Sequence, residues 1–195
     1  VGAQTGNTPP LTDGGLTYPR VQLFRSALNL RYYGIIHEVL QLGVQGPIGR
    51  LSTLTYRRGH SSYGYQDQDP APVKFAKHAH LARKWLLDHP DDARMQFYLA
   101  RSLQDAGQLD AARVAYQQRC EMTGWDEERA YAWYQVGVIQ IQQGADPTVA
   151  LLQAYGIGVP KAEPLVLLAR WYRDDARRQF GLADLFARKA AEIPQ

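Results

Sequence analysis

Beyond residue 72 the apolar side chains recur at helical spacing, and short polar loops interrupt the pattern at regular intervals. Ala, Leu, Arg, Gln and Glu dominate this part of the chain, and all of them are compatible with helices. Because the loops hold only a few residues, consecutive helices are expected to lie antiparallel. The predicted helices cover residues 74–88, 92–106, 109–122, 126–143, 148–155, 163–173 and 176–193.

The helical part also repeats with a period of about 34 residues, the length of a tetratricopeptide repeat. The clearest unit, residues 93–126, resembles that repeat, in which two antiparallel helices meet at small residues. Its matching positions are Leu99, Ala100, Gly107, Ala112 and Tyr116. The following units are looser, and we expect about three stacked hairpins, because a single hairpin cannot bury its apolar face alone. Gly107 is expected to end the second helix and Asp126 to cap the fourth.

Residues 1–72 differ from the rest, since turn-forming Gly, Pro, Asn and Asp residues separate short β-prone runs. A hairpin is predicted at residues 13–15, strands at 21–24, 32–36 and 51–56, and a short helix at 37–41. These strands are too few for an independent sheet, so their partners are expected upstream. The chain opens at Val1 in Gly/Thr/Pro-rich sequence, and we expect it to be cut from a longer protein.

Composition places the chain among ordinary folded proteins. Of its 195 residues, 45% are hydrophobic and 21% are charged, and the net charge is +3. The basic residues are spread along the chain, which gives no case for nucleic acid as a partner. No apolar run reaches the roughly 18 residues that a membrane span requires. We expect a cytoplasmic protein without a membrane span. Cys120 is the single cysteine, and its helical context predicts a buried structural thiol.

Two segments of the N-terminal part combine arginine, aromatic and His-Glu residues. They are Tyr18–Arg25 (Tyr-Pro-Arg-Val-Gln-Leu-Phe-Arg) and Arg31–Glu38 (Arg-Tyr-Tyr-Gly-Ile-Ile-His-Glu). Together they resemble the C-terminal edge of the catalytic domain in bacterial family 2 glycosyltransferases, which have the GT-A fold. The resemblance implies that residues 1–72 come from such a domain and that residues 73–195 form a helical tail behind it.

The resemblance also implies a role for the polar residues of this region. In that family the His of the His-Glu pair lies near a divalent metal (Mn or Mg) and the nucleotide diphosphate, which makes His37 the candidate metal ligand. Glu38 is the candidate catalytic carboxylate. Arg20 or Arg25 would bind the diphosphate of the nucleotide sugar through its guanidinium fork. His60, in a loop bordering the acceptor site, would also contact the nucleotide sugar.

Simpler roles are open to the same residues. A His at a strand end is often satisfied by the backbone, and a Glu is favourable in the first turn of a helix. Arg20 and Arg25 lie five residues apart, so on a strand they face opposite sides and only one would reach a site. Either could instead pair with a carboxylate, and the run around His60 could be a solvated linker.

Motifs in the helical part fit the same family, whose catalytic domain is followed by tetratricopeptide-like helices. They include Pro90–Arg94, Phe97–Ala100, Tyr116-x-x-Arg119, Gly124–Tyr131 and Lys161–Leu165. The metal-binding Asp-x-Asp motif and the nucleotide-binding half of the family are expected upstream of Val1. Asp67-Gln-Asp69 has the same letters, but it lies in a Pro-rich loop where the family has no metal motif, and we interpret it as coincidence.

Two further groups of residues in the helical part have alternative interpretations. His78 and His80 lie two apart on a predicted helix, where they cannot share a metal, and are expected on the surface. The aromatic residues Trp125, Tyr131, Trp133 and Tyr134 gather where the third and fourth helices meet. They are either core residues or the lining of a groove that grips a peptide or glycan.

These observations lead to two functional hypotheses. In the first, the chain is the C-terminal portion of a metal-dependent glycosyltransferase, inactive by itself, whose helices bind a glycan or protein acceptor or a partner protein. The nucleotide sugar is the donor. In the second, the chain is a non-enzymatic adaptor whose tetratricopeptide-type helices bind protein. The expected fold is mainly α, a helical hairpin array preceded by a short α/β segment.

Overall fold

The computed structural model of the chain describes residues 30–41, 69–174 and 178–194. They belong to two compact units, one made of residues 1–33 and 39–62 and the other of residues 34–38 and 63–195. Several sequence-based predictions lie outside the described residues. These are the sites at Arg20, Arg25 and His60, Asp67, the hairpin at 13–15, and the strands at 21–24 and 51–56.

The described part of the first unit is a short antiparallel ribbon. Strand β1 (Arg31–Tyr33) pairs with strand β2 (Val39–Gln41), with Tyr32 opposite Leu40. The predicted strand over 32–36 therefore ends early, and the predicted short helix over 37–41 is wrong. The reason lies in the turn between the strands. Gly34, with φ of 107°, and His37, with φ of 52°, adopt left-handed backbone conformations that occur in neither a regular helix nor a strand.

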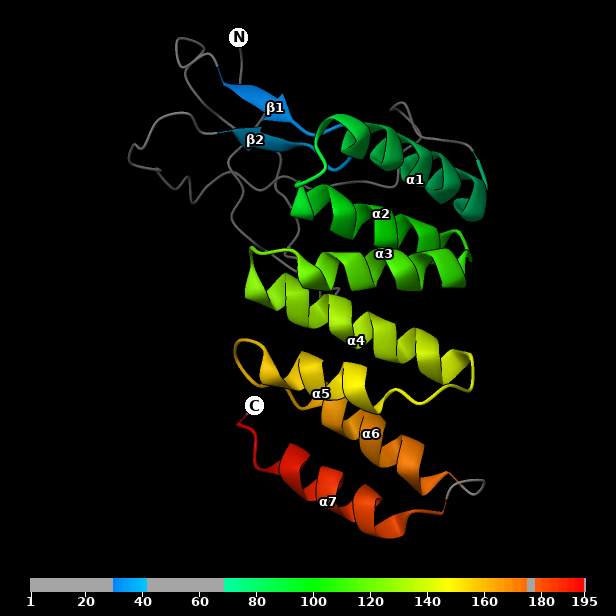
Figure 1. Cartoon of the computed structure of the whole chain (residues 1–195), viewed down its shortest axis with the longest axis vertical. Coiled ribbons are helices and arrows are strands. Elements are labelled where there is room, and N and C mark those ends of the chain that lie inside the picture. The colour runs from blue at the N-terminus through cyan, green and yellow to red at the C-terminus, as the bar shows by residue number, and fades with distance from the viewer. Residues whose placement is uncertain (1–29, 42–68, 175–177, 195) are drawn as a thin grey trace, which may run out of the picture. The chain divides into compact units, whose positions relative to one another are not determined.

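The second unit is mainly helical, and each helix packs on the next in sequence order (Figure 1). Its helices are α1 (Ala71–Asp88), α2 (Ala93–Asp105), α3 (Leu109–Glu121), α4 (Asp126–Gln142), α5 (Thr148–Gly156), α6 (Glu163–Arg173) and α7 (Phe180–Ala191). The predicted bounds are confirmed within two residues, except at two helix starts. Helix α1 begins earlier, with a proline in its first turn, where the missing N–H removes no hydrogen bond. Helix α7 begins later, at Phe180.

Side-chain caps and glycines set several helix ends. Asp92 caps α2, because its carboxylate accepts a hydrogen bond from the Met95 N–H at 2.9 Å, and it also accepts one from the Trp85 indole at 2.9 Å. Gly107 follows α2 in a left-handed conformation, as expected. The prediction that Asp126 caps α4 is wrong by one residue. Trp125 occupies the cap position, and Asp126 starts an acidic first turn that is favourable near the positive helix end.

Small side chains allow close packing between the helices. One alanine on each of the first four helices is completely buried: Ala82, Ala100, Ala112 and Ala132. Large residues such as Leu103, Tyr116 and Ile139 fill the space between them, and Leu151, Leu165 and Leu168 form a second cluster along α5 and α6. Within the described part of the chain, no helix is long and apolar enough to cross a membrane.

Cys120 is buried in the first of these clusters, as predicted, with 4% of its surface exposed. Burial raises the pKa of its thiol to about 12. The thiolate is the reactive form of cysteine, so we expect the folded protein to react with a disulfide reagent such as DTNB orders of magnitude more slowly than the urea-unfolded chain at the same pH. Stopped-flow absorbance measures both rates, and equal rates would contradict the burial of Cys120.

Candidate functional site

A buried ion-pair network connects the start of α2, the end of α3 and the start of α4. Its centre is Glu128, in the first turn of α4, which is buried. One carboxylate oxygen accepts a hydrogen bond from Arg119 Nε on α3 at 2.9 Å, and the other accepts one from Arg94 Nη1 on α2 at 2.9 Å. Arg119 is only 1% exposed and also donates to the carbonyl of Met122 at 3.3 Å. Two guanidinium groups therefore share one carboxylate.

Arg94 is exposed, unlike its two partners, yet it is held in place from several sides. Its Nη2 donates a hydrogen bond to the Tyr98 hydroxyl at 2.9 Å. Its guanidinium carbon lies 5.1 Å from the centre of the Tyr98 ring and 5.6 Å from that of the Trp125 ring, both within cation–π range. Trp125 is 59% exposed. The result is a fixed cation between two aromatic rings at the protein surface.

Aromatic side chains continue from this point along α4. The ring of Phe97 lies 5.9 Å from that of Tyr131, and the ring of Tyr131 lies 6.2 Å from that of Tyr134. Tyr131 is 45% exposed. We call the surface formed by Arg94, Tyr98, Trp125, Tyr131 and Tyr134 the aromatic–arginine band. Of the two interpretations of the predicted aromatic cluster, the core applies to Trp133 and Tyr134, which each pack against a core cluster, whereas Trp125 and Tyr131 are exposed.

The turn over residues 34–38 brings His37 to Tyr98 of the same band. Ile36 is buried in the core of the helical unit, which anchors the turn. The imidazole of His37 stacks on the Tyr98 ring with centroids 4.3 Å apart and an interplanar angle of 19°. Burial, His78 and Arg101 lower the pKa of His37, in that order. The candidate catalytic residue Glu38 is exposed beside it.

His78 and His80 differ in their surroundings. His80 is exposed on α1, as predicted. His78 is half-buried instead, and its ring lies edge-on to that of His37 at 6.1 Å and to that of Phe75 at 5.9 Å. The sequence pattern correctly separated the two faces of α1 but could not show that the turn over 34–38 covers one of them.

The surroundings of His37 can be compared with the ligand set of a divalent metal. No group of three or more His, Cys, Asp or Glu side chains that could hold a metal occurs among residues 30–41, 69–174 and 178–194. The charges that act on His37 come from His78, Arg101, Glu38 and Arg94, so cationic groups outnumber the one carboxylate. The two guanidinium groups among them, Arg101 and Arg94, suit an anionic group such as phosphate. Asp69 forms an ion pair with Lys77.

No protein-family model matches the sequence, and no curated protein matches it either.

Arg94, Arg119 and Glu128 lie within the motifs that resemble the family, but the sequence alone indicated no role for them. A signal for their pairing was present, because Arg94 and Glu128 lie 34 residues apart and carry opposite charges. Phe97 and Tyr131, which also meet, are separated by the same interval, since 131 − 97 = 34. Equivalent positions of successive repeats are expected to be neighbours, so the period could have predicted both contacts.

Proposed function

We propose that this chain is the C-terminal portion of a family 2 glycosyltransferase and that its tetratricopeptide-like helices hold the acceptor or a partner protein. One observation carries the proposal. The motifs that resemble this family are scattered between residues 18 and 165. Five of them contribute one residue each to a continuous set of contacts, which consists of His37, Arg94, Tyr98, Arg119 and Glu128. Residues that share a site have a common reason to occur together, which supports the family resemblance.

His37 and Glu38 have distinct roles in this proposal. In a complete enzyme of this kind, a divalent metal (Mn or Mg) neutralises the leaving diphosphate of the nucleotide sugar. His37 is held by its stack on Tyr98 and lies near two guanidinium groups, so it is placed to donate a hydrogen bond to a phosphate oxygen. This role suits its surroundings better than metal ligation. Glu38 is exposed and remains the candidate carboxylate for the acceptor hydroxyl or thiol.

A binding experiment tests the role of His37. In the protein expressed from the complete reading frame, His37→Ala is expected to weaken UDP–Mn binding by about tenfold or more, because a hydrogen bond to a charged group contributes about 1.5–3 kcal/mol. Isothermal titration calorimetry measures the affinity. His80→Ala, on the exposed side of α1, is the matched control and should change nothing. Equal affinities for wild type and His37→Ala would exclude His37 from the donor site.

The second candidate is a protein-interaction adaptor. It is favoured by the exposure of Trp125 and Tyr131, since aromatic residues and arginine are enriched at the centres of protein interfaces. The reading frame upstream of Val1 distinguishes the candidates. Strand–helix alternation with an Asp-x-Asp motif supports the glycosyltransferase, whereas a start codon directly before Val1 supports the adaptor.

A further inference from the structure

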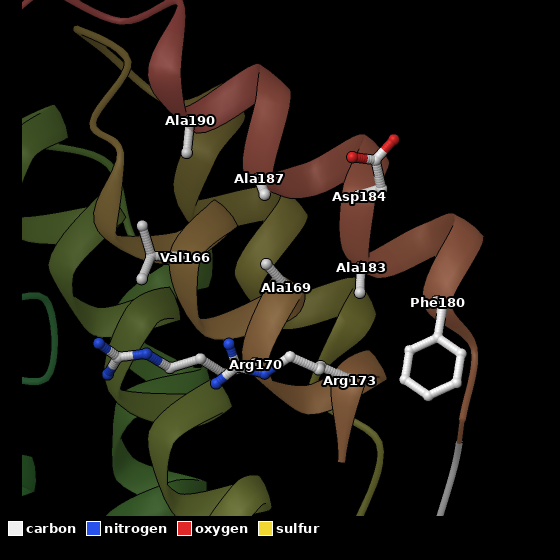
Figure 2. Close-up of a pocket in the computed structure, with 9 residues that line it drawn as sticks. All are labelled: Val166, Ala169, Arg170, Arg173, Phe180, Ala183, Asp184, Ala187 and Ala190. Carbon is white, nitrogen blue, oxygen red and sulfur yellow. The ribbon is translucent and has the colours of Figure 1, made fainter. Parts of the chain in front are cut away.

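A second surface feature lies away from the aromatic–arginine band, between the last two described helices. It is a groove of about 450 Å³ between α6 and α7 (Figure 2). Helix α6 contributes Val166, Ala169, Arg170 and Arg173, which are spaced i, i+3, i+4 and i+7 and so form one face of the helix. The groove is therefore bordered by a continuous helix face.

Helix α7 contributes a matching face. Phe180, Ala183, Asp184 and Ala187 line the groove with the same i, i+3, i+4, i+7 spacing. The alanines of both helices line the groove, and Phe180 lies at one end (Figure 2). Phe180 is 58% exposed and Ala187 is exposed as well. Ala183 is already buried, whereas the small, exposed Ala187 would allow another helix to approach closely, since the distance between packed helices depends on side-chain size at the contact.

Earlier hairpins of the stack are covered on the corresponding side. The next helix along the chain, α4, packs on the α2–α3 hairpin through α3, and α6 packs on the α4–α5 hairpin through α5. No helix of the described residues packs on α7 beyond α6. The face of α6 and α7 that borders the groove thus resembles an internal surface of the stack, and no helix of the described residues covers it.

The charges on the two borders of the groove have opposite signs. Arg170 and Arg173 stand on the α6 side, and neither forms an ion pair in the part of the chain that the structure describes. Asp184 stands on the α7 side, where it pairs with Arg188 at 2.8 Å along its own helix and remains exposed. A two-fold rotation would place α6 of one molecule against α7 of another. Both arginines would then face an aspartate at each of two equivalent contacts.

We propose that the α6–α7 groove docks the same groove of a second copy of this chain, which forms a two-fold symmetric dimer. A two-fold interface uses the same patch on both molecules, so the patch must be complementary to itself. The opposite borders of this groove meet that condition, and the two hairpins together would make a four-helix contact. The proposal is independent of the glycosyltransferase assignment.

Charge reversal tests the dimer. Sedimentation velocity over a wide concentration range is expected to show self-association of the 195-residue chain. The double variant Arg170→Glu/Arg173→Glu places like charges at both contacts, and so does Asp184→Arg. Each variant alone should weaken association by about tenfold or more, because juxtaposed like charges cost several kcal/mol. An equimolar mixture of the two variants should restore it, because both contacts then pair opposite charges.

Controls separate this interface from others. Circular dichroism verifies that each variant is folded. Trp125→Ala, in the aromatic–arginine band, should leave association unchanged. The proposal is overturned if the wild type stays monomeric, if the charge variants associate as the wild type does, or if their mixture does not restore association. A monomeric wild type that binds a synthetic acidic amphipathic helix through Arg170 and Arg173 would likewise overturn it and assign the groove to a foreign partner.

Discussion

Glu128→Gln is expected to lower the free energy of unfolding of the helical unit by about 3–5 kcal/mol, the cost of removing one partner from a buried ion pair. Arg119 is 1% exposed and relies on Glu128 for its charge-assisted hydrogen bond at 2.9 Å. The neutral amide would leave that guanidinium buried without a counter-charge. It would also present an N–H₂ group to one of the two arginines that Glu128 now accepts from.

Urea denaturation of the chain, followed by circular dichroism at the helix band, measures the loss. Asp126→Asn is a matched control, because it removes the same charge from the same helical turn. Asp126 pairs with Arg129 at 2.9 Å in an exposed setting, so its replacement should cost at most about 1 kcal/mol. If the two variants lose equal stability, the network around Glu128 is not a buried ion pair. Arg94→Gln should lose an amount of stability between those of the two variants, because Arg94 is exposed but pairs with the buried Glu128.

The helices were predictable because their signals are local. Apolar spacing and the glycines after the helices, such as Gly107 and Gly144, fixed most bounds within two residues. The failures occurred where local signals were ambiguous. Residues 37–41 contain helix-compatible side chains, yet the left-handed conformations of Gly34 and His37 create a turn followed by a strand. Asp92 caps its helix and Asp126 does not, although both are acidic residues that precede apolar segments.

The candidate site was predictable only in part. The period of about 34 residues relates Arg94 to Glu128, so this contact follows from the repeat itself. The stack of His37 on Tyr98 joins residues that are 61 apart (98 − 37) and belong to no common repeat, so only the tertiary structure shows it. The groove between α6 and α7 is likewise shown only by the tertiary structure. The spacing of Arg170 and Arg173 reveals one helix face, but not that this face is left open by the other helices of the described residues.

Gly137 is expected to resist replacement by alanine, because helix α5 leaves no room for a side chain there. It lies in the middle of α4 and is buried, and a Cβ atom placed on it would lie 2.6 Å from both Cγ and Cδ2 of Leu151 on α5. Leu151 is itself completely buried, so it has little room to move. Gly137→Ala should therefore force α4 and α5 apart or push Leu151 from its rotamer. Overpacking of this kind costs about 1–3 kcal/mol.

The substitution also brings a benefit that must be separated from the clash. Alanine is favoured over glycine inside a helix by about 1 kcal/mol. Gly181→Ala is the control that measures this gain in helix propensity without a clash. Gly181 lies in α7, and a Cβ there meets no atom within 4 Å. We expect Gly181→Ala to be neutral or stabilising and Gly137→Ala to be less stable than it by about 1–3 kcal/mol in urea denaturation. Equal stabilities would mean that α4 and α5 pack less closely than the structure shows. A difference of the expected size would show that close contact at Gly137 holds the middle of the stack together, between the aromatic–arginine band and the α6–α7 groove.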